Sequence, residues 1–276
     1  MVVSVSGTAG VAPEGRSEPS SLEVGTKLVL PCSATVYRAA GEASVWVNPD
    51  PAGRYTPRKS VDPLAGEDKA NAERVNAERA ARRAQAKLRR YCKANVLSRH
   101  VTVTYAPAHE RSSRYEVLRD VAGFRRALFG YLGRRVAVAA VPEQGTKKGR
   151  WHCEIAIGVY VAQSALQQLW GLGWVNIHRY GDRHKHQDEV QAAWQVAGYL
   201  SKYVGKALGE TAGSKGGHRY EVSQGFQPVA ERFEVWTFPE GIAQVVAIFD
   251  GELPQSVWRS SEVENWLGPP VWCGYW

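Results

Sequence analysis

Two tyrosines four residues apart, Tyr199 and Tyr203, lie in the segment GYLSKYVGK beside Lys202 and Lys206. In a helix this spacing points both phenol rings toward the same side. A phenol is a weak nucleophile at its usual pKa of about 10, but neighbouring ammonium groups favour the phenolate form. Both tyrosines are therefore candidate nucleophiles for attack on a phosphodiester, with Lys202 as the assisting cation.

A helical projection of residues 188–208 separates the tyrosines from the apolar side chains. At about 100° per residue, one stripe is apolar and consists of Val190, Trp194, Ala197, Val204 and Leu208. Tyr199 and Tyr203 fall almost opposite this stripe, whereas aromatic residues of the core would share it. Ordinary surface positions would explain this face of the helix, but they would not explain the pairing of two tyrosines with two lysines.

A candidate metal site lies earlier in the chain, in the segment RWHCEIAIGV. Side chains alternate along a strand, so His152 and Glu154 share one face, with their Cα atoms roughly 6.5–7 Å apart. A hairpin after VPEQG brings Glu143 close to them. Imidazole and carboxylate groups suit Mg²⁺ or Mn²⁺. A surface pair without a ligand is the alternative, and the loop residues His184 and His186 form a weaker rival site.

The composition indicates a globular protein with a basic charge balance. Of its 276 residues, 44% are hydrophobic, enough for a core, and the formal net charge of +8 favours a polyanion such as nucleic acid as partner. A basic protein without such a partner is the alternative. The four cysteines form no CxxC pair, which argues against a zinc ribbon and a disulfide framework.

Several other classes of protein do not fit the sequence. It contains no loop of the form GxxxxGK[ST], so we expect no ATPase or helicase domain. The segment MVVSVSGTAG lacks the features of a signal peptide, and the apolar run VAVAAVP is too short to span a bilayer. We therefore expect a cytoplasmic protein that does not interact with membranes.

The pattern of residues predicts four segments. Residues 1–65 are rich in Gly, Pro and Ser and should be irregular, with one or two strands, and residues 66–95 should form a basic helix. Residues 96–240 should form the main domain, and residues 241–276 a Trp-rich extension. Within the main domain we expect strands at 100–106, 135–143, 150–161 and 174–180, and helices at 114–134, 162–173 and 188–208. This order predicts an α+β fold with an antiparallel sheet.

Three blocks, VTVTYA, GRWHCEIAI and GYLSKYVGK, resemble in order the three motifs of the HUH-type rolling-circle replication initiators (Rep proteins). The flanking segments KLRRYCKANVLSRHVTVTY, LWGLGWVNIHR and RYEVSQGFQP are similar to those of actinobacterial plasmid initiators, so the resemblance covers about residues 80–228. It implies an RRM-like or ferredoxin-like central antiparallel sheet flanked by helices, the HUH endonuclease fold. It also implies an enzyme that nicks and rejoins single-stranded DNA at a plasmid or phage-type origin.

The resemblance also assigns roles to individual residues. His152 matches the first metal-binding histidine, and Glu154 stands where the family usually has a second histidine. Glu143 matches an upstream acidic ligand, with Gln144 as the substitute if the register differs by one residue. The cofactor would be Mg²⁺ or Mn²⁺.

The third motif allows two nucleophiles. Tyr199 with Lys202 fits one form of the motif, and Tyr203 with Lys206 fits the compact form KYxxK. We prefer a scheme in which both tyrosines act in alternation, through a covalent 5′-phosphotyrosine intermediate.

The expected partners are single-stranded and origin DNA, together with a separate host helicase. The candidate DNA-binding residues are basic side chains near the metal motif, on the tyrosine helix and on the basic helix: Lys147, Lys148, Arg150, Lys206, Arg89 and Arg90. A conjugative relaxase or a single-strand transposase would use the same chemistry, and a non-catalytic RRM-like nucleic-acid-binding protein is the alternative from another class.

Overall fold

The computed structural model describes residues 31–48, 67–145, 149–178, 180, 188–206, 219–264, 266 and 268–276. These residues form two antiparallel sheets, which we call sheet A and sheet B, and five α-helices. The fold is α+β, with antiparallel sheets flanked by helices, which confirms the predicted fold class and is consistent with an RRM-like HUH domain.

Sheet B is built from the main domain in the order β6-β3-β5-β4-β7. Its strands are β3 (Arg99–Tyr105), β4 (Val138–Gln144), β5 (Trp151–Ile157), β6 (Gly173–His178) and β7 (Glu221–Val222). The predicted alternation of strands and helices from residue 100 onward is confirmed, with boundaries shifted by a few residues. Because β5 lies between β3 and β4, the second and first predicted motifs are direct neighbours in space.

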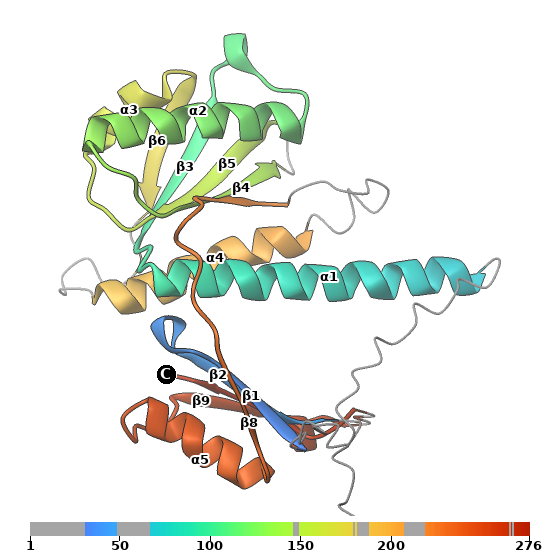
Figure 1. Ribbon diagram of the computed structural model, residues 1–276. Helices are drawn as coiled ribbons and strands as arrows, with labels where there is room; N and C mark the ends of the chain where they lie inside the picture. The colour runs from blue at the N-terminus through green and yellow to red at the C-terminus, as the bar shows by residue number, and fades with distance from the viewer. Residues whose placement is uncertain are drawn as a thin grey trace, which may run out of the picture.

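Helices cover both faces of sheet B (Figure 1). One face packs against α2 (Arg114–Leu132) and α3 (Gln163–Trp170) through apolar residues that alternate along β3 and β5, among them Val101, Val103 and Ile155. The other face packs against α4 (Glu189–Lys206) and the long α1 (Glu67–Ala94), which lie between the two sheets.

Local signals in the sequence set the ends of α2. The side chain of Ser113 accepts a hydrogen bond from the backbone of Glu116, whose carboxylate accepts one from the backbone of Ser113 in return, a capping box. Gly133 ends the helix in the left-handed conformation (φ 65°), which suits glycine.

Sheet A has the order β8-β1-β2-β10-β9 and lies beyond α1 and α4, with α5 on its far side (Figure 1). Its elements are β1 (Cys32–Tyr37), β2 (Glu42–Val47), β8 (Glu231–Val235), α5 (Phe238–Ile248), β9 (Ser256–Arg259) and β10 (Val271–Tyr275). The strands come from the segments 1–65, 96–240 and 241–276, so this sheet joins parts that composition alone separates. The boundaries of these segments as domains stay predictions.

Helix α5 was not predicted from the sequence, because Pro239 and Gly241 lie within it. Proline is tolerated in the first turn of a helix, and Thr237 caps this turn by accepting a hydrogen bond from the backbone of Glu240. Gly241 is required by packing: a Cβ there would lie 2.7 Å from a methyl carbon of Val45 in β2. The helix therefore lies directly on sheet A, where the C-terminal Trp272 is also buried.

A buried carboxylate, that of Glu42 in β2, connects sheet A to α1. Arg89 Nε lies 3.1 Å from its Oε1, Arg90 Nε 2.9 Å from its Oε2, and Lys93 Nζ 3.3 Å from its Oε1. Burial is the largest influence on Lys93 and lowers the pKa of its ammonium group, against the charge of Glu42. Arg89 and Arg90, which we expect from the sequence to contact DNA, thus hold a carboxylate inside the protein.

We expect Glu42→Gln to destabilise the protein by about 3–5 kcal/mol, because it removes the charge that compensates three cations, one of them buried. Denaturant unfolding followed by circular dichroism measures the change. The matched control is Glu78→Gln, which breaks the exposed ion pair with Arg74 and should cost no more than about 1 kcal/mol. Equal effects of the two substitutions would show that the Glu42 cluster adds nothing to stability.

Candidate active site

The predicted metal ligands meet on the face of sheet B that points toward α4. In the register of the sheet, His152 of β5 lies between Glu143 of β4 and Thr104 of β3. Glu154, two residues further along β5, lies beside Thr102. The predicted sharing of one face by His152 and Glu154 is confirmed, since the residues between and beside them point into the opposite core.

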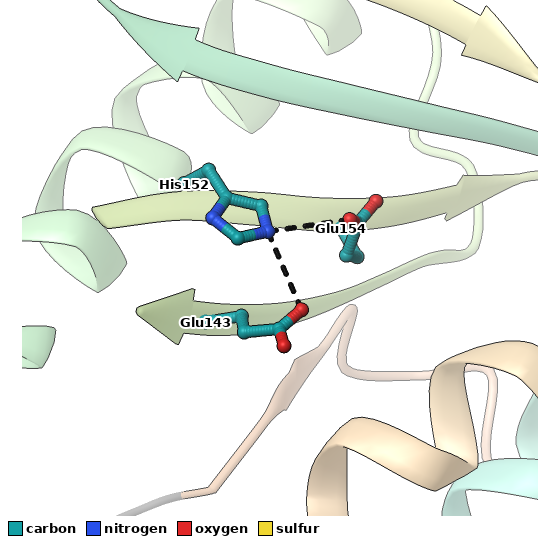
Figure 2. A group of neighbouring side chains, drawn as sticks. All are labelled: Glu143, His152 and Glu154. Atoms are coloured by element: carbon teal, nitrogen blue, oxygen red, sulfur yellow. Dashed lines mark ion pairs between the residues drawn. The ribbon is translucent and has the colours of Figure 1, made fainter. Parts of the chain in front are cut away.

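Glu143, His152 and Glu154 form a group that fits a divalent metal ion (Figure 2). His152 Nε2 lies 3.3 Å from Glu143 Oε2 and 3.4 Å from Glu154 Oε1, and the three candidate ligand atoms lie within 4.8 Å of one another. Two carboxylates and one imidazole are donors that suit a hard or borderline divalent cation. Gln144, the alternative ligand, is exposed and donates to the carbonyl of Gly149 instead.

The second oxygen of Glu154 is held by groups that the sequence analysis did not single out as partners. His100 Nε2 and Thr102 Oγ1 each lie 2.6 Å from Glu154 Oε2, and both donate to it because a carboxylate only accepts. Burial raises the pKa of Glu154, but the hydrogen bonds from His100, His152 and Thr102 outweigh burial and lower the pKa to about 2. Glu154 is therefore ionised, with Oε1 directed at His152.

His152 is held between two negative charges. Burial lowers its pKa, but the hydrogen bond and charge of Glu154 and the charge of Glu143 outweigh burial, so the pKa is raised above its usual value. The imidazole thus tends to carry a second proton between the two carboxylates. A cation binding to this group takes the place of that proton.

Three further residues extend this network across the sheet. His178 Nε2 lies 2.8 Å from Thr102 Oγ1, and the Tyr180 hydroxyl lies 2.7 Å from His100 Nδ1. The His100 and His178 rings stack with their centroids 4.6 Å apart. The two-residue period of HVTVTY could have placed His100 on the site face, since it predicts the shared face of Thr102 and Thr104. His178 and Tyr180 could not be found in this way, because their contacts depend on the pairing of β6 with β3.

Helix α4 places the two tyrosines against this network. The Tyr199 ring lies 4.7 Å from the buried His100 ring and 5.0 Å from the Tyr203 ring, measured between centroids. The Tyr203 hydroxyl donates a hydrogen bond to the Tyr199 hydroxyl. The tyrosines and the metal-ligand group therefore share one site, as the sequence predicts.

Two details of the prediction for α4 are wrong. The helix is covered by both sheet B and α1, so the tyrosines are half-buried, whereas Val190 of the predicted apolar stripe is exposed. The pKa of Tyr203 is raised rather than lowered, by burial, by the hydrogen bond with Tyr199 and by the charges of Glu143 and Glu154. Lys202, the predicted assisting cation, is exposed.

The predicted DNA-binding residues are only partly described. Arg150 is exposed beside the metal-ligand group and pairs with Glu110 at 2.8 Å. Lys147 and Lys148 lie outside the described residues, and so does the side chain of Lys206.

Residues 98–208 match the model of one protein family, described as replication-associated protein ORF2. The chain carries a replication-associated domain of this family. The match begins just before β3 and ends just after α4, so it includes the metal-ligand group, the network around His100 and both tyrosines. This family supports a role as a replication initiator, and DNA is the partner that this role implies.

No curated protein and no solved structure matches the chain. Within the described residues, none of the helices combines the length and the apolar character needed to cross a membrane.

We expect Glu143→Gln in the replication-associated domain to lower the affinity for Mn²⁺ at least about tenfold, because one charged ligand of a hard cation is lost. Isothermal titration calorimetry without DNA measures the affinity. Glu110→Gln, which changes an exposed carboxylate paired with Arg150, is the matched control and should leave the affinity unchanged. Unchanged Mn²⁺ binding by Glu143→Gln would remove Glu143 from the ligand set.

His100→Phe should lower Mn²⁺ affinity by about 10- to 100-fold, the range typical for groups that orient metal ligands. The substitution keeps a ring between Tyr199 and His178 but removes the hydrogen bond to Glu154. Tyr180→Phe removes only the outer hydrogen bond to His100 and should have a smaller effect. Wild-type Mn²⁺ affinity in His100→Phe, with an unchanged melting temperature, would show that His100 does not orient the ligand.

Proposed function

We propose that the protein is a replication initiator that nicks and rejoins single-stranded DNA at a rolling-circle origin through a covalent 5′-phosphotyrosine intermediate. The observation that carries the proposal is the contact of Tyr199 with His100, since the same imidazole binds the candidate metal ligand Glu154. A nucleophile and a cation-binding group are thereby held at one place. We assign this activity to the domain of residues 96–240.

The residues present fit a divalent cation, because Glu154 is ionised and turns its Oε1 toward His152 and Glu143. Mg²⁺ or Mn²⁺ bound there would polarise the phosphodiester and offset the charge of the two carboxylates. His100 and Thr102 keep the Glu154 carboxylate in one orientation, so this group is organised before the substrate binds.

The tyrosines have different environments, which suggests an order of action. Tyr203 donates to the Tyr199 oxygen and therefore stabilises negative charge on it, while its own pKa is raised. In the first step the Tyr199 oxygen would bond to phosphorus and lose its proton to solvent. The bond from phosphorus to the 3′ oxygen would break, and that oxygen would take up a proton as a free hydroxyl. Tyr203 would then attack the regenerated junction.

Cleavage of a tyrosine-linked strand conserves the energy of the phosphodiester bond, so the strand can be rejoined without a nucleotide cofactor. The free 3′ hydroxyl could prime synthesis. Unwinding of the template would be the task of a separate helicase, because the sequence lacks a GxxxxGK[ST] loop.

The test is adduct formation on a denaturing gel, with a labelled pool of random-sequence single strands and Mn²⁺. The wild-type protein should form a covalent adduct. Tyr199→Phe should slow the first cleavage by at least about 100-fold, because it removes the proposed first nucleophile, and Tyr203→Phe should slow it less. The double variant should form no adduct, and the control Tyr160→Phe, an exposed tyrosine away from the site, should behave as wild type.

Two results would contradict the scheme. An adduct that persists in the double variant would show that the nucleophile is another residue. Complete loss of cleavage in Tyr203→Phe would show that the two tyrosines do not act in the proposed order.

A further inference from the structure

A hollow of about 720 Å³ opens beside His152 on the site face of sheet B. Thr104, His152 and Trp174 form its floor and one wall, and Arg150 lies at its rim. None of the described residues that line it belongs to α4. The tyrosine helix therefore covers the end of the site face near His100, and the end near His152 is left open.

Trp174 is the largest exposed side chain in this hollow. It is 59% exposed, although it projects from a paired strand beside Thr104. Its backbone is closely held: a Cβ on Gly173 would overlap the carbonyl oxygen of Thr104, so only glycine permits this approach of β6 to β3. The side chain of Gln167 bonds to the backbone on both sides of Trp174, at the Gly173 carbonyl and the Val175 N–H. A rigid strand thus presents an indole to the hollow.

We propose that this hollow binds one unpaired base of single-stranded DNA, stacked on Trp174, and that this base belongs to the nucleotide that keeps the free 3′ hydroxyl after cleavage. The inference rests on the proposed function. Every base has a π face, so stacking on an aromatic side chain suits a single strand of any sequence. The volume lies within the range of about 300–1,000 Å³ that is usual for sites that enclose small ligands.

The charges at the rim suit the phosphate that accompanies such a base. Arg150 pairs with Glu110 at 2.8 Å, but the side chains are 54% and 45% exposed. An ion pair in contact with water contributes little, so Arg150 can exchange Glu110 for a phosphate oxygen at small cost. This residue is also the one predicted DNA-binding residue that the structure places beside His152 without a buried partner.

The side of the cleavage site follows from the geometry of phosphoryl transfer. Attacking and leaving oxygens lie roughly in line with phosphorus. The tyrosines approach the metal-ligand group from α4, whereas the hollow opens on the other side of His152, away from the Tyr199 contact with His100. The leaving 3′ oxygen and its nucleotide are therefore directed toward Trp174.

The first experiment measures binding without chemistry. The dissociation constant of a fluorescein-labelled 20-nucleotide oligothymidine is determined by anisotropy in EDTA. Trp174→Ala should weaken binding by about 5- to 100-fold, equivalent to about 1–3 kcal/mol at about 1.4 kcal/mol per tenfold change. Trp174→Phe should retain most of the affinity. Trp236→Ala, which removes a similarly exposed indole (56%) beyond β8 of sheet A, should have no effect.

Wild-type affinity in Trp174→Ala, or an equal loss in Trp236→Ala, would overturn the proposal. Equal losses in Trp174→Phe and Trp174→Ala would overturn stacking as the cause. Because this experiment uses neither metal nor a tyrosine reaction, its outcome is separate from that of the adduct test. Adduct formation by a Trp174→Ala protein of unchanged DNA affinity would leave the proposed function in place and reject the base site.

The second experiment tests which nucleotide is bound. Once the cleaved position is known from the wild-type adduct, strands with one abasic residue on either side of it are compared. Loss of the base that precedes the nick should weaken wild-type binding by the same factor as Trp174→Ala, and should have no further effect in Trp174→Ala. Coupling of Trp174 to the base that follows the nick would reverse the proposed orientation.

Discussion

The Glu154 carboxylate is a buried charge on which the arrangement of the site depends. A buried carboxylate must be compensated by hydrogen bonds or cations, and Glu154 uses its oxygens for two separate purposes. His100 and Thr102 bind Oε2, whereas Oε1 faces His152. His100 then contacts the Tyr199 ring. The orientation of a candidate metal ligand and the position of a candidate nucleophile are thereby set by the same buried imidazole.

The parts of this site that follow from local periodicity could be predicted from the sequence. Alternation along β5 was sufficient to place His152 and Glu154 on one face, and the short hairpin to place Glu143 beside them. The contacts of His178 and Tyr180 could not be predicted in this way, because β6 pairs with β3 across the sheet. Glu42 and its three cations were likewise out of reach, since a strand of sheet A and a helix that follows an undescribed segment meet only in the folded protein.

The tyrosine helix shows where a projection of one helix fails. Such a projection distinguishes one apolar stripe from one polar stripe, as on a helix with a single partner. Helix α4 has two partners, sheet B and α1, so residues opposite the apolar stripe are also covered. The resulting half-burial of Tyr203, together with the nearby carboxylates, raises its pKa, whereas the sequence suggested activation by lysines.

The position of α4 between sheet B and α1 has a mechanical consequence. Any tension on a strand joined to Tyr199 would be applied to α4, and not to an exposed loop. From α4 the load would pass into α1, and through Arg89, Arg90 and Lys93 to Glu42 in sheet A. Both sheets would thus share a pulling force that arises while the bound strand is being displaced. The attachment point is anchored in the whole described fold, although the attached residue lies in a single helix.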